Sequence, residues 1–435
     1  MPTASGISAQ FVMAKEVYTN EVQQISGTPS AVFSLIFDGA QTTVGGLATN
    51  AAAAAVQAAL EALPNIGTGG VVCAGGVLPA AITITFSGAL VAGRNVPQIT
   101  VQTGITGLTV ATNTAGTGYG DGATPTRALE IVDESVKLDI ARIEAKSLRS
   151  ASRTQRSDRW APGKRQAGGD LTFELGSKGF AMLLGQAFGL DTVITTPSGG
   201  SLTRDHSFAI VAQDTSNRSF TAQIGIPDVT GSATNVRAFT YNGCKVTDWE
   251  FTLDLDGILM MKLGIDAMDE TTATALATAT YASSFEVFYW TGAQVSLGGG
   301  NIDVRKFSIK GSTGLNQDRF FLRNSNLKKQ PIAKDFYDIT GSLEIELSSL
   351  TEYTRYVAGT TTALTILVEG STIEAITGET GKYGMKFTLP VVRFEGETPD
   401  LNGMDIVPVN LPFKALYDGT NPICTARYRT TDVAE

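Results

Sequence analysis

Residue types that build catalytic and metal sites are nearly absent from this sequence. It contains one histidine, His206, and three cysteines, Cys73, Cys244 and Cys424, an odd number at wide spacing. A disulfide framework needs paired cysteines and a zinc site needs closely spaced ligands, so we expect neither and predict reduced thiols. His206 is predicted to lie at the surface, at the end of a loop. We therefore expect no catalytic residue, no cofactor and no metal, and the protein is not expected to be an enzyme.

Charged residues are also scarce. They make up 17% of the chain, and 33 Lys and Arg against 42 Asp and Glu give a formal net charge of −9. Tight nucleic-acid binding depends on clustered cations that contact phosphates, so this balance argues against a general DNA-binding protein. Residues 1–21 lack the features of a signal peptide, and the most apolar run, 51–63, is too short to cross a bilayer. No membrane association is expected.

What the sequence does contain is a repeated pattern. Residues 169–177 and 341–349, offset by 172 positions (341 − 169), alternate apolar and polar residues as half-buried strands do. Each is followed by an apolar stripe at helical spacing, and Ser177 and Ser349 are predicted to cap the two helices. A second match, between 239–267 and 387–415, has an offset of 148 (387 − 239). The sequence therefore predicts an internal duplication.

Residues 21–125 interrupt the first copy with a different composition. Arg94 is the only basic residue in this window, where Gly, Ala, Thr and Val dominate. Alternation around Phe33 and Phe86 predicts strands, and apolar spacing within 51–63 predicts one helix. We expect a small inserted β-α-β-β domain followed by a glycine-rich linker.

Several segments resemble the major tail tube proteins of long, non-contractile-tailed bacteriophages. They are residues 5–10, the strand region from Pro125 to Arg149, and residues 169–175, and the similarity is best over 2–20 and about 125–270. In that family each tube unit is a small β-sandwich or barrel with one flanking helix. Rings of such units join sheet edge to sheet edge into an inner barrel through which DNA passes. The resemblance implies a structural virion protein of the phage tail, assembled in the host cytoplasm.

These observations predict a mainly β protein with α+β elements. The first tail-tube-like unit is expected over residues 1–20 and 126–285, the inserted surface-exposed domain over 21–125, and the second tail-tube-like unit over 286–435. Two units per chain would place six units in a trimeric ring, whereas a single true tube unit per chain would require a hexamer. The expected partners are the chain itself, other tail proteins (tape measure, terminator and distal tail protein), and passing double-stranded DNA without specific binding.

A long basic segment precedes each of the two repeated strands. Proline and glycine in these segments predict a hairpin or extended loop. Guanidinium groups on such loops pair well with carboxylates of another molecule, so we expect assembly elements between rings, with an ordinary surface loop as the alternative. The residues concerned are Arg149, Arg153, Arg156, Arg159, Lys164, Arg165, Arg319, Arg323, Lys328 and Lys329.

Acidic residues lie on one side of several predicted strands. Trp249, Phe251 and Leu253 share one face, which leaves carboxylates on the other. A wall without phosphate clamps lets a polyanion slide, so these acids are candidates to face the lumen, and the alternative is a solvated outer face. The candidates are Glu174, Glu250, Asp254, Asp256, Glu344 and Glu346.

Two other classes of function are open at this point. A β-rich surface protein or adhesin would use the inserted domain to bind a host-surface ligand. A carbohydrate-active enzyme on a β scaffold would need only paired carboxylates and no histidine.

Overall fold

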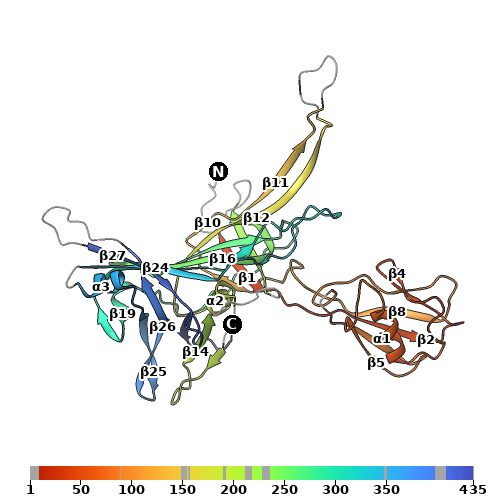
Figure 1. The fold of residues 1–435 in the computed structure, drawn as a ribbon, viewed down its shortest axis with the longest axis horizontal. Coiled ribbons are helices and arrows are strands. Elements are labelled where there is room, and N and C mark those ends of the chain that lie inside the picture. The colour runs from red at the N-terminus through yellow and green to blue at the C-terminus, as the bar shows by residue number, and fades with distance from the viewer. Residues whose placement is uncertain are drawn as a thin grey trace. The chain divides into compact units, whose positions relative to one another are not determined.

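The computed structural model describes residues 9–88, 90–147, 154, 157–189, 193–210, 218–227, 236–346, 350–396 and 408–434. Over these residues the protein is mainly β, as predicted. The chain forms two compact units, which we call the main unit (Met1–Lys15 with Thr124–Glu435) and the small unit (Glu16–Ala123) (Figure 1). Each unit has a hydrophobic core of its own. The chain leaves the main unit after its first strand and returns to it at Thr124.

The small unit contains one helix and two short sheets, with strand orders β5-β6-β2-β8 and β4-β3-β7. Phe86 stacks on Phe37 in its core, with ring centroids 5.2 Å apart. Helix α1 buries Val56 and Leu60 of the predicted stripe. The elements are β2 (Val22–Gly27), β3 (Leu35–Phe37), β4 (Ala40–Gln41), α1 (Ala53–Glu61), β5 (Val71–Gly75), β6 (Ile82–Phe86), β7 (Thr100–Val101) and β8 (Leu108–Thr114).

The main unit is built almost entirely from antiparallel strands. Its first half contains β1 (Gln10–Lys15), β9 (Arg127–Leu129), β10 (Asp133–Glu134), β11 (Lys137–Glu144), β12 (Trp160–Glu174), α2 (Ala181–Phe188), β13 (Val193–Thr195), β14 (Arg204–Ile210), β15 (Phe220–Pro227), β16 (Val236–Asp254), β17 (Met260–Ala267) and β18 (Asp269–Thr271). Its second half contains η2 (Trp290–Gly292), β19 (Ala293–Leu297), β20 (Gly300–Ile302), β21 (Val304–Ser312), β22 (Leu315–Asn316), β23 (Ile332–Ala333), β24 (Asp338–Glu346), α3 (Thr351–Ala358), β25 (Thr362–Ile376), β26 (Glu379–Phe394), β27 (Pro408–Ala415) and β28 (Cys424–Thr430).

One continuous sheet, the long sheet, crosses both halves of the main unit. Its strand order is β11-β12-β17-β16-β21-β24-β27-β26. Successive side chains of a strand point to opposite faces, and Phe173, Phe251 and Leu343 are buried on one of them. The pairing of β16 with β21 joins the two halves, with Phe251 opposite Ile309. The opposite face of the long sheet is polar.

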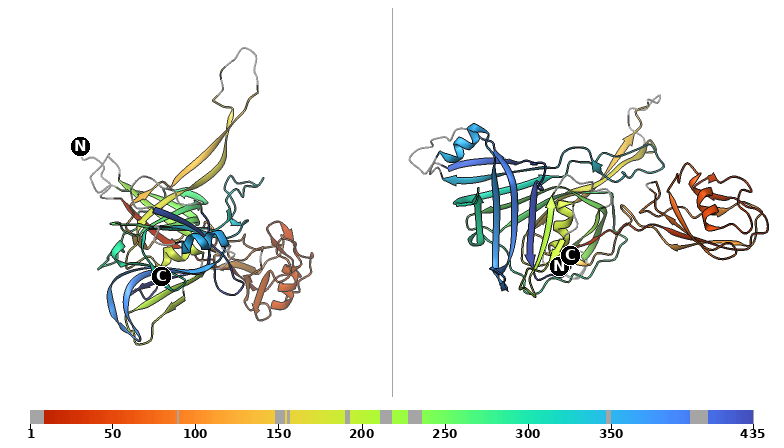
Figure 2. Two further views of the ribbon diagram at one scale, coloured as in Figure 1. Left: turned by 60° about the vertical axis from the view of Figure 1, so that its left-hand side comes forward. Right: turned by 60° about the horizontal axis from the view of Figure 1, so that its bottom comes forward.

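A second layer of strands covers the buried face of the long sheet. One part of it has the order β9-β1-β15-β16-β18. The other part has the order β20-β19-β25-β26-β28-β14-β13, in which β14 and β13 of the first half extend the strands of the second. The strands β16 and β26 are long enough to take part in both layers. Helix α2 is enclosed between the layers, whereas α3 lies at one end of the main unit (Figures 1 and 2).

Helix α2 is the centre of the main core. All of its residues except Met182 are buried, and Phe188 lies within 5.2 to 6.4 Å of four other aromatic rings. The helix begins at Ala181 without a side-chain cap, so the prediction that Ser177 caps it is wrong. The Ser177 hydroxyl instead accepts a hydrogen bond from the Glu286 amide at 3.1 Å. Ser349, the second predicted cap, lies outside the described residues.

The strand pairing repeats between the two halves. In the first half β12 pairs with β17, and Leu171 is opposite Leu263. In the second half β24 pairs with β27, and Leu343 is opposite Leu411. The equivalent residues are separated by 172 and 148 positions, the two offsets seen in the sequence. Both halves therefore use the same register for the same strands.

A glycine in this pairing provides a test of the packing. A Cβ on Gly341 would meet the Ser308 carbonyl oxygen and the Phe413 ring, and both belong to neighbouring strands. We expect Gly341→Ala to lower the free energy of unfolding by about 1–3 kcal/mol, because the strands would have to move apart. Denaturant unfolding followed by tryptophan fluorescence measures this change. In Gly300→Ala the new Cβ would lie 3.8 Å from its nearest neighbour, so this control should unfold like the wild type.

Candidate functional site

The polar face of the long sheet carries charged groups from several neighbouring strands. One row across it, set by the strand registers, places Lys262 opposite Glu250, and Glu250 opposite Lys310. A parallel row, four residues further along β16, places Lys306 between Asp254 and Glu344. Acids and bases therefore alternate across neighbouring strands of this face.

Five of the six predicted lumen acids lie on this face, namely Glu174, Glu250, Asp254, Glu344 and Glu346. The sixth, Asp256, follows the end of β16 in a turn with a positive φ of 57°. Glu250 accepts a hydrogen bond from the Ser308 hydroxyl at 2.7 Å. The structure thus brings together acids from β12, β16 and β24, which the sequence places far apart. Whether the face lines a lumen stays a prediction.

The cations of the polar face were not predicted, and most of them are paired. The amino nitrogens of Lys262, Lys306 and Lys414 lie 2.8 to 2.9 Å from carboxylate oxygens of Asp170, Asp254 and Asp338, and Arg305 lies 3.0 Å from Glu346. Hydrogen bonding to Asp170 raises the pKa of Lys262, and hydrogen bonding to Asp254 raises that of Lys306. Exposed pairs of this kind add little stability. Their consequence is that these four cations already have carboxylate partners.

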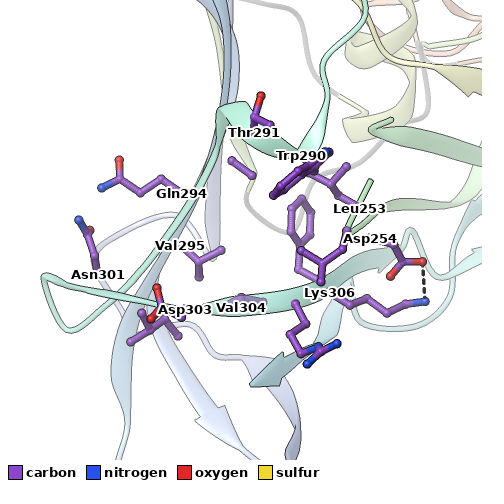
Figure 3. A pocket seen from close by; sticks show the side chains of 15 residues that line it. Leu253, Asp254, Trp290, Thr291, Gln294, Val295, Asn301, Asp303, Val304 and Lys306 are labelled. Atoms are coloured by element: carbon purple, nitrogen blue, oxygen red, sulfur yellow. Dashed lines mark hydrogen bonds and ion pairs between the residues drawn. The ribbon is translucent and has the colours of Figure 1, made fainter. Parts of the chain in front are cut away.

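A cavity of about 490 Å³ opens beside the Asp254–Lys306 pair. It lies between the end of β16, η2, β19 and β21, and Figure 3 shows Trp290 and Val295 among its lining residues. The lining mixes apolar side chains with Asp, Asn and Arg and contains neither histidine nor cysteine. We assign it no catalytic role.

The first basic segment forms a long hairpin, as predicted. Strands β11 and β12 extend beyond the body of the main unit (Figure 1). Arg149, Arg153 and Arg156 lie outside the described residues. Arg159 is exposed at the base of the turn, 4.0 Å from Asp158. Arg165 makes two hydrogen bonds to Asp269, at 2.6 and 2.8 Å, so its guanidinium group has a carboxylate partner within its own chain.

Residues 313–337, which lie within the second basic segment (residues 306–338), contact the first hairpin. Lys164 of β12 is 2.7 Å from Asp318, and the amide of Arg165 donates to the Asn326 carbonyl at 3.2 Å. Among the predicted assembly residues, Arg319 and Arg323 donate to the carbonyls of Gln330 and Leu327, and Lys329 lies 5.3 Å from the Phe321 ring centroid. Both basic segments therefore contact each other within one chain.

Lys328, another predicted assembly residue, is fully buried. Its amino group forms an ion pair with Asp266 of β17, which is 2% exposed. Burial raises the pKa of Asp266, and the charges of Lys328 and Lys245 oppose that rise. Nothing in the sequence indicates this pair, because a lysine in a basic, polar segment has the pattern of a surface residue. The ion pair holds residues 313–337 against β17, and the buried amino group of Lys328 is not available to a neighbouring molecule.

His206 is also buried, so the prediction of a surface histidine is wrong. It lies on β14, and its Nε2 donates to the Asp432 carbonyl at 2.9 Å. Three cysteines are free thiols, and two of them, Cys244 and Cys424, are buried. In the described part of the chain, no group of three His, Cys, Asp or Glu side chains could hold a metal ion. No helix among these residues has the length and hydropathy needed to span a membrane.

The fold and the polar face define a β-rich protein with an extended, charge-balanced sheet surface. A family model described as "Phage tail tube protein" matches residues 113–415, which is well over half of the chain. The chain therefore belongs to the phage tail tube protein family, a family of structural virion proteins of the tail. No curated protein matches it. The matched region covers the main unit from β9 to β27 and leaves out β1, β28 and most of the small unit.

The buried ion pair predicts a large effect of one lysine. We expect Lys328→Met to lower the free energy of unfolding by about 3 kcal/mol, because Asp266 would remain buried with its main partner lost. A raised pKa means that the folded state holds its proton more tightly than the unfolded state, so the deficit should shrink as the pH falls and Asp266 becomes neutral. Denaturant titrations in neutral and acidic buffer measure both effects.

The controls separate charge from packing. Lys329→Met removes an exposed lysine next in sequence and should leave stability unchanged. The double variant Asp266→Asn with Lys328→Met should recover part of the loss, since the buried carboxylate left without Lys328 is no longer charged, while the buried Lys245 keeps its charge. A Lys328→Met protein as stable as the wild type at neutral pH would contradict the assignment.

Proposed function

We propose that this tail tube protein self-assembles into rings, which stack into the tail tube of a long, non-contractile-tailed phage and form its conduit for genome delivery. The observation that carries the proposal is the pairing of β16 with β21. It joins two equivalent halves into one long sheet, with Asp248 opposite Ser312 at one end of the ladder. A junction that joins two equivalent units inside a chain is suited to join units of successive chains.

Both ends of the long sheet carry strands that fit this junction. Lys137 of β11 lies opposite Gly168, and Lys310 of β21 lies opposite Thr340. Because Gly168 and Thr340 are separated by the same 172 positions as the repeated strands, β11 is the first-half equivalent of β21. Arg393 of β26 lies opposite Lys414 of β27. Since β27 is the equivalent of β17, which pairs with β16, the end of β26 is the second-half equivalent of β16. In the described part of the chain, β11 pairs only with β12, and its outer edge carries no strand. Unpaired edges of this kind favour association with another chain.

We propose a trimeric ring. Each chain contributes two halves with the same strand register, so three chains provide six equivalent units. The tandem division of the chain near residue 285 is part of this proposal, and a hexamer would follow if only one half served as a tube unit. Closure into a ring removes the two free edges, which would otherwise lead to open-ended aggregation.

The polar face of the long sheet is the proposed lumen wall. Closure of the long sheet would turn this face toward a common axis, because the opposite face packs on the core. DNA binds protein mainly where free Lys or Arg contacts phosphate. On this face Lys262, Lys306, Lys414 and Arg305 have carboxylate partners. Passing DNA would meet a charge-balanced wall that offers few phosphate contacts.

The remaining parts of the main unit are assigned to contacts along the tube. The β11–β12 hairpin, with Arg159 exposed near its end, is proposed to reach the next ring, and other tail proteins would bind the ends of the tube.

The small unit is proposed to be displayed on the outside, since most of it lies beyond the family match. Assembly would take place in the host cytoplasm, and we propose no catalytic role.

The inferred junction makes an exact residue pair testable. Inside the chain, Asp248 lies opposite Ser312. The second-half equivalent of Asp248 is Gly396, and the first-half equivalent of Ser312 is Asp139. The junction between chains would therefore place Gly396 of one chain opposite Asp139 of the next. We expect the double variant Asp139→Cys with Gly396→Cys to form disulfide-linked oligomers under oxidation, because a Cβ on Gly396 has only ordinary contacts, the closest at 3.5 Å. Non-reducing gels of assembled protein, in a Cys73→Ser background, detect the link.

Two outcomes bear on this junction. The pair Asp133→Cys with Gly396→Cys is the control, because Asp133 is displaced along the same edge by about 20 Å at 3.3 Å per residue. It should give monomers on the same gel. Rings that assemble but link through neither pair would show that the halves meet in some other register.

The lumen assignment predicts an electrostatic effect on genome delivery. Glu344→Lys would add a cation beside Lys306 on the polar face and give phosphates a contact. We expect full-length tails but slower DNA ejection, with a defect that becomes smaller at high salt. The control Glu130→Lys changes the net charge equally at an exposed site next to β9, in the outer layer. Equal ejection rates for the two variants would contradict a lumen position for Glu344.

A further inference from the structure

The two helices of the main unit are equivalent but differ in burial. Both end at a glycine with positive φ, Gly189 at 70° and Gly359 at 64°. Aligning these ends places Leu350 at the position of Phe180 and Val357 at the position of Ala187. Phe180 and Ala187 are 1% and 0% exposed. Leu350 and Val357 are 66% and 64% exposed, so these two apolar residues of α3 face solvent in the single chain, while Tyr353 between them is half-buried.

Strands from the second half of the chain complete the burial of α2, which also packs on β14 and β16 of its own half. Phe188 of α2 packs edge to face on Phe387 of β26, with ring centroids 6.4 Å apart. Just before the helix, the Tyr428 hydroxyl of β28 donates to the Gly176 carbonyl at 2.9 Å. A helix of the first half is thus covered in part by the outer layer of the half that follows it.

In a ring, the half that follows the second half belongs to the next chain. Its outer layer contains β15 and β16, the equivalents of β25 and β26, and Phe239 stands at the position of Phe387. Phe239 is only partly buried and Ile226 of β15 is 41% exposed in the single chain. The outer layer of the first half therefore presents apolar side chains where a cover for α3 is required.

We propose that α3 is an interface element between copies of this chain. Its stripe, Leu350, Tyr353 and Val357, packs on the β15–β16 layer of the next chain, as α2 packs on β26 and β28 of its own chain. This interface lies in the outer layer and is additional to the edge pairing of the long sheet. The inference rests on the proposed ring, because only ring closure places a first half beside α3.

Cysteine labelling tests the contact in the assembled protein. In a Cys73→Ser background, Val357→Cys should react with a maleimide in monomers and react at least tenfold more slowly in rings or tubes. Val44→Cys is the control, since Val44 is 71% exposed on the small unit and should react equally in both states. Full reactivity of Val357→Cys in rings that are visible by electron microscopy would overturn the α3 contact and leave the ring proposal intact.

A charge placed on the stripe gives an independent measurement. Val357→Asp should leave the monomer folded, because the side chain is exposed there, but should raise the concentration needed for assembly at least tenfold. Val44→Asp introduces the same change at a similarly exposed valine and should assemble like the wild type. Unchanged assembly of Val357→Asp would overturn the inference. Failure of the wild-type chain to form rings would overturn the proposed function and the α3 contact with it.

Discussion

The backbone pairing of β16 with β21 is the interaction on which the main unit depends. Seven residue pairs of this ladder join the two halves, and the pairing makes eight strands into one sheet. Because side chains alternate along each strand, one register decides which residues of both halves share a face. A shift of β16 by one residue against β21 would turn Phe251 out of the core and bring Glu250 into it, while Ile309 stayed inside. Burial of the apolar face thus holds the polar face in place.

The chemistry of the polar face follows from this arrangement. Carboxylates and amines meet across neighbouring strands, as in the pairs Lys262–Asp170 and Lys306–Asp254. Such pairs contribute little to stability in water, but they occupy cations that would otherwise bind phosphate. A surface for the passage of DNA requires this balance more than it requires a high negative charge. The buried pair Lys328–Asp266 has a different role, because it holds residues 313–337 against the sheet.

The repeated strand pairing also shows which elements of the second half lack the cover that their first-half counterparts have. In the first half α2 is buried, with β26 and β28 of the second half contributing to its cover. The equivalent helix α3 and the end of β26 have no following half. Both helices require a cover of strands. For α2 the same chain provides it, and for α3 we propose that another copy does.

The sequence alone determined the mainly β character, the two repeated strands with their offsets, the compositional break after residue 21 and the alternation that sorts Glu250 and Asp254 from Phe251 and Leu253. These features are local, because strand periodicity is set by neighbouring residues. It could not determine which cation meets which acid, that Lys328 and His206 are buried, or that the Ser177 hydroxyl bonds to Glu286 instead of capping α2. Those outcomes depend on strands more than sixty residues apart in sequence, such as β16 and β24, being brought side by side through β21. Only the tertiary structure decides such contacts, because the register that creates them is set by the packing of the whole core.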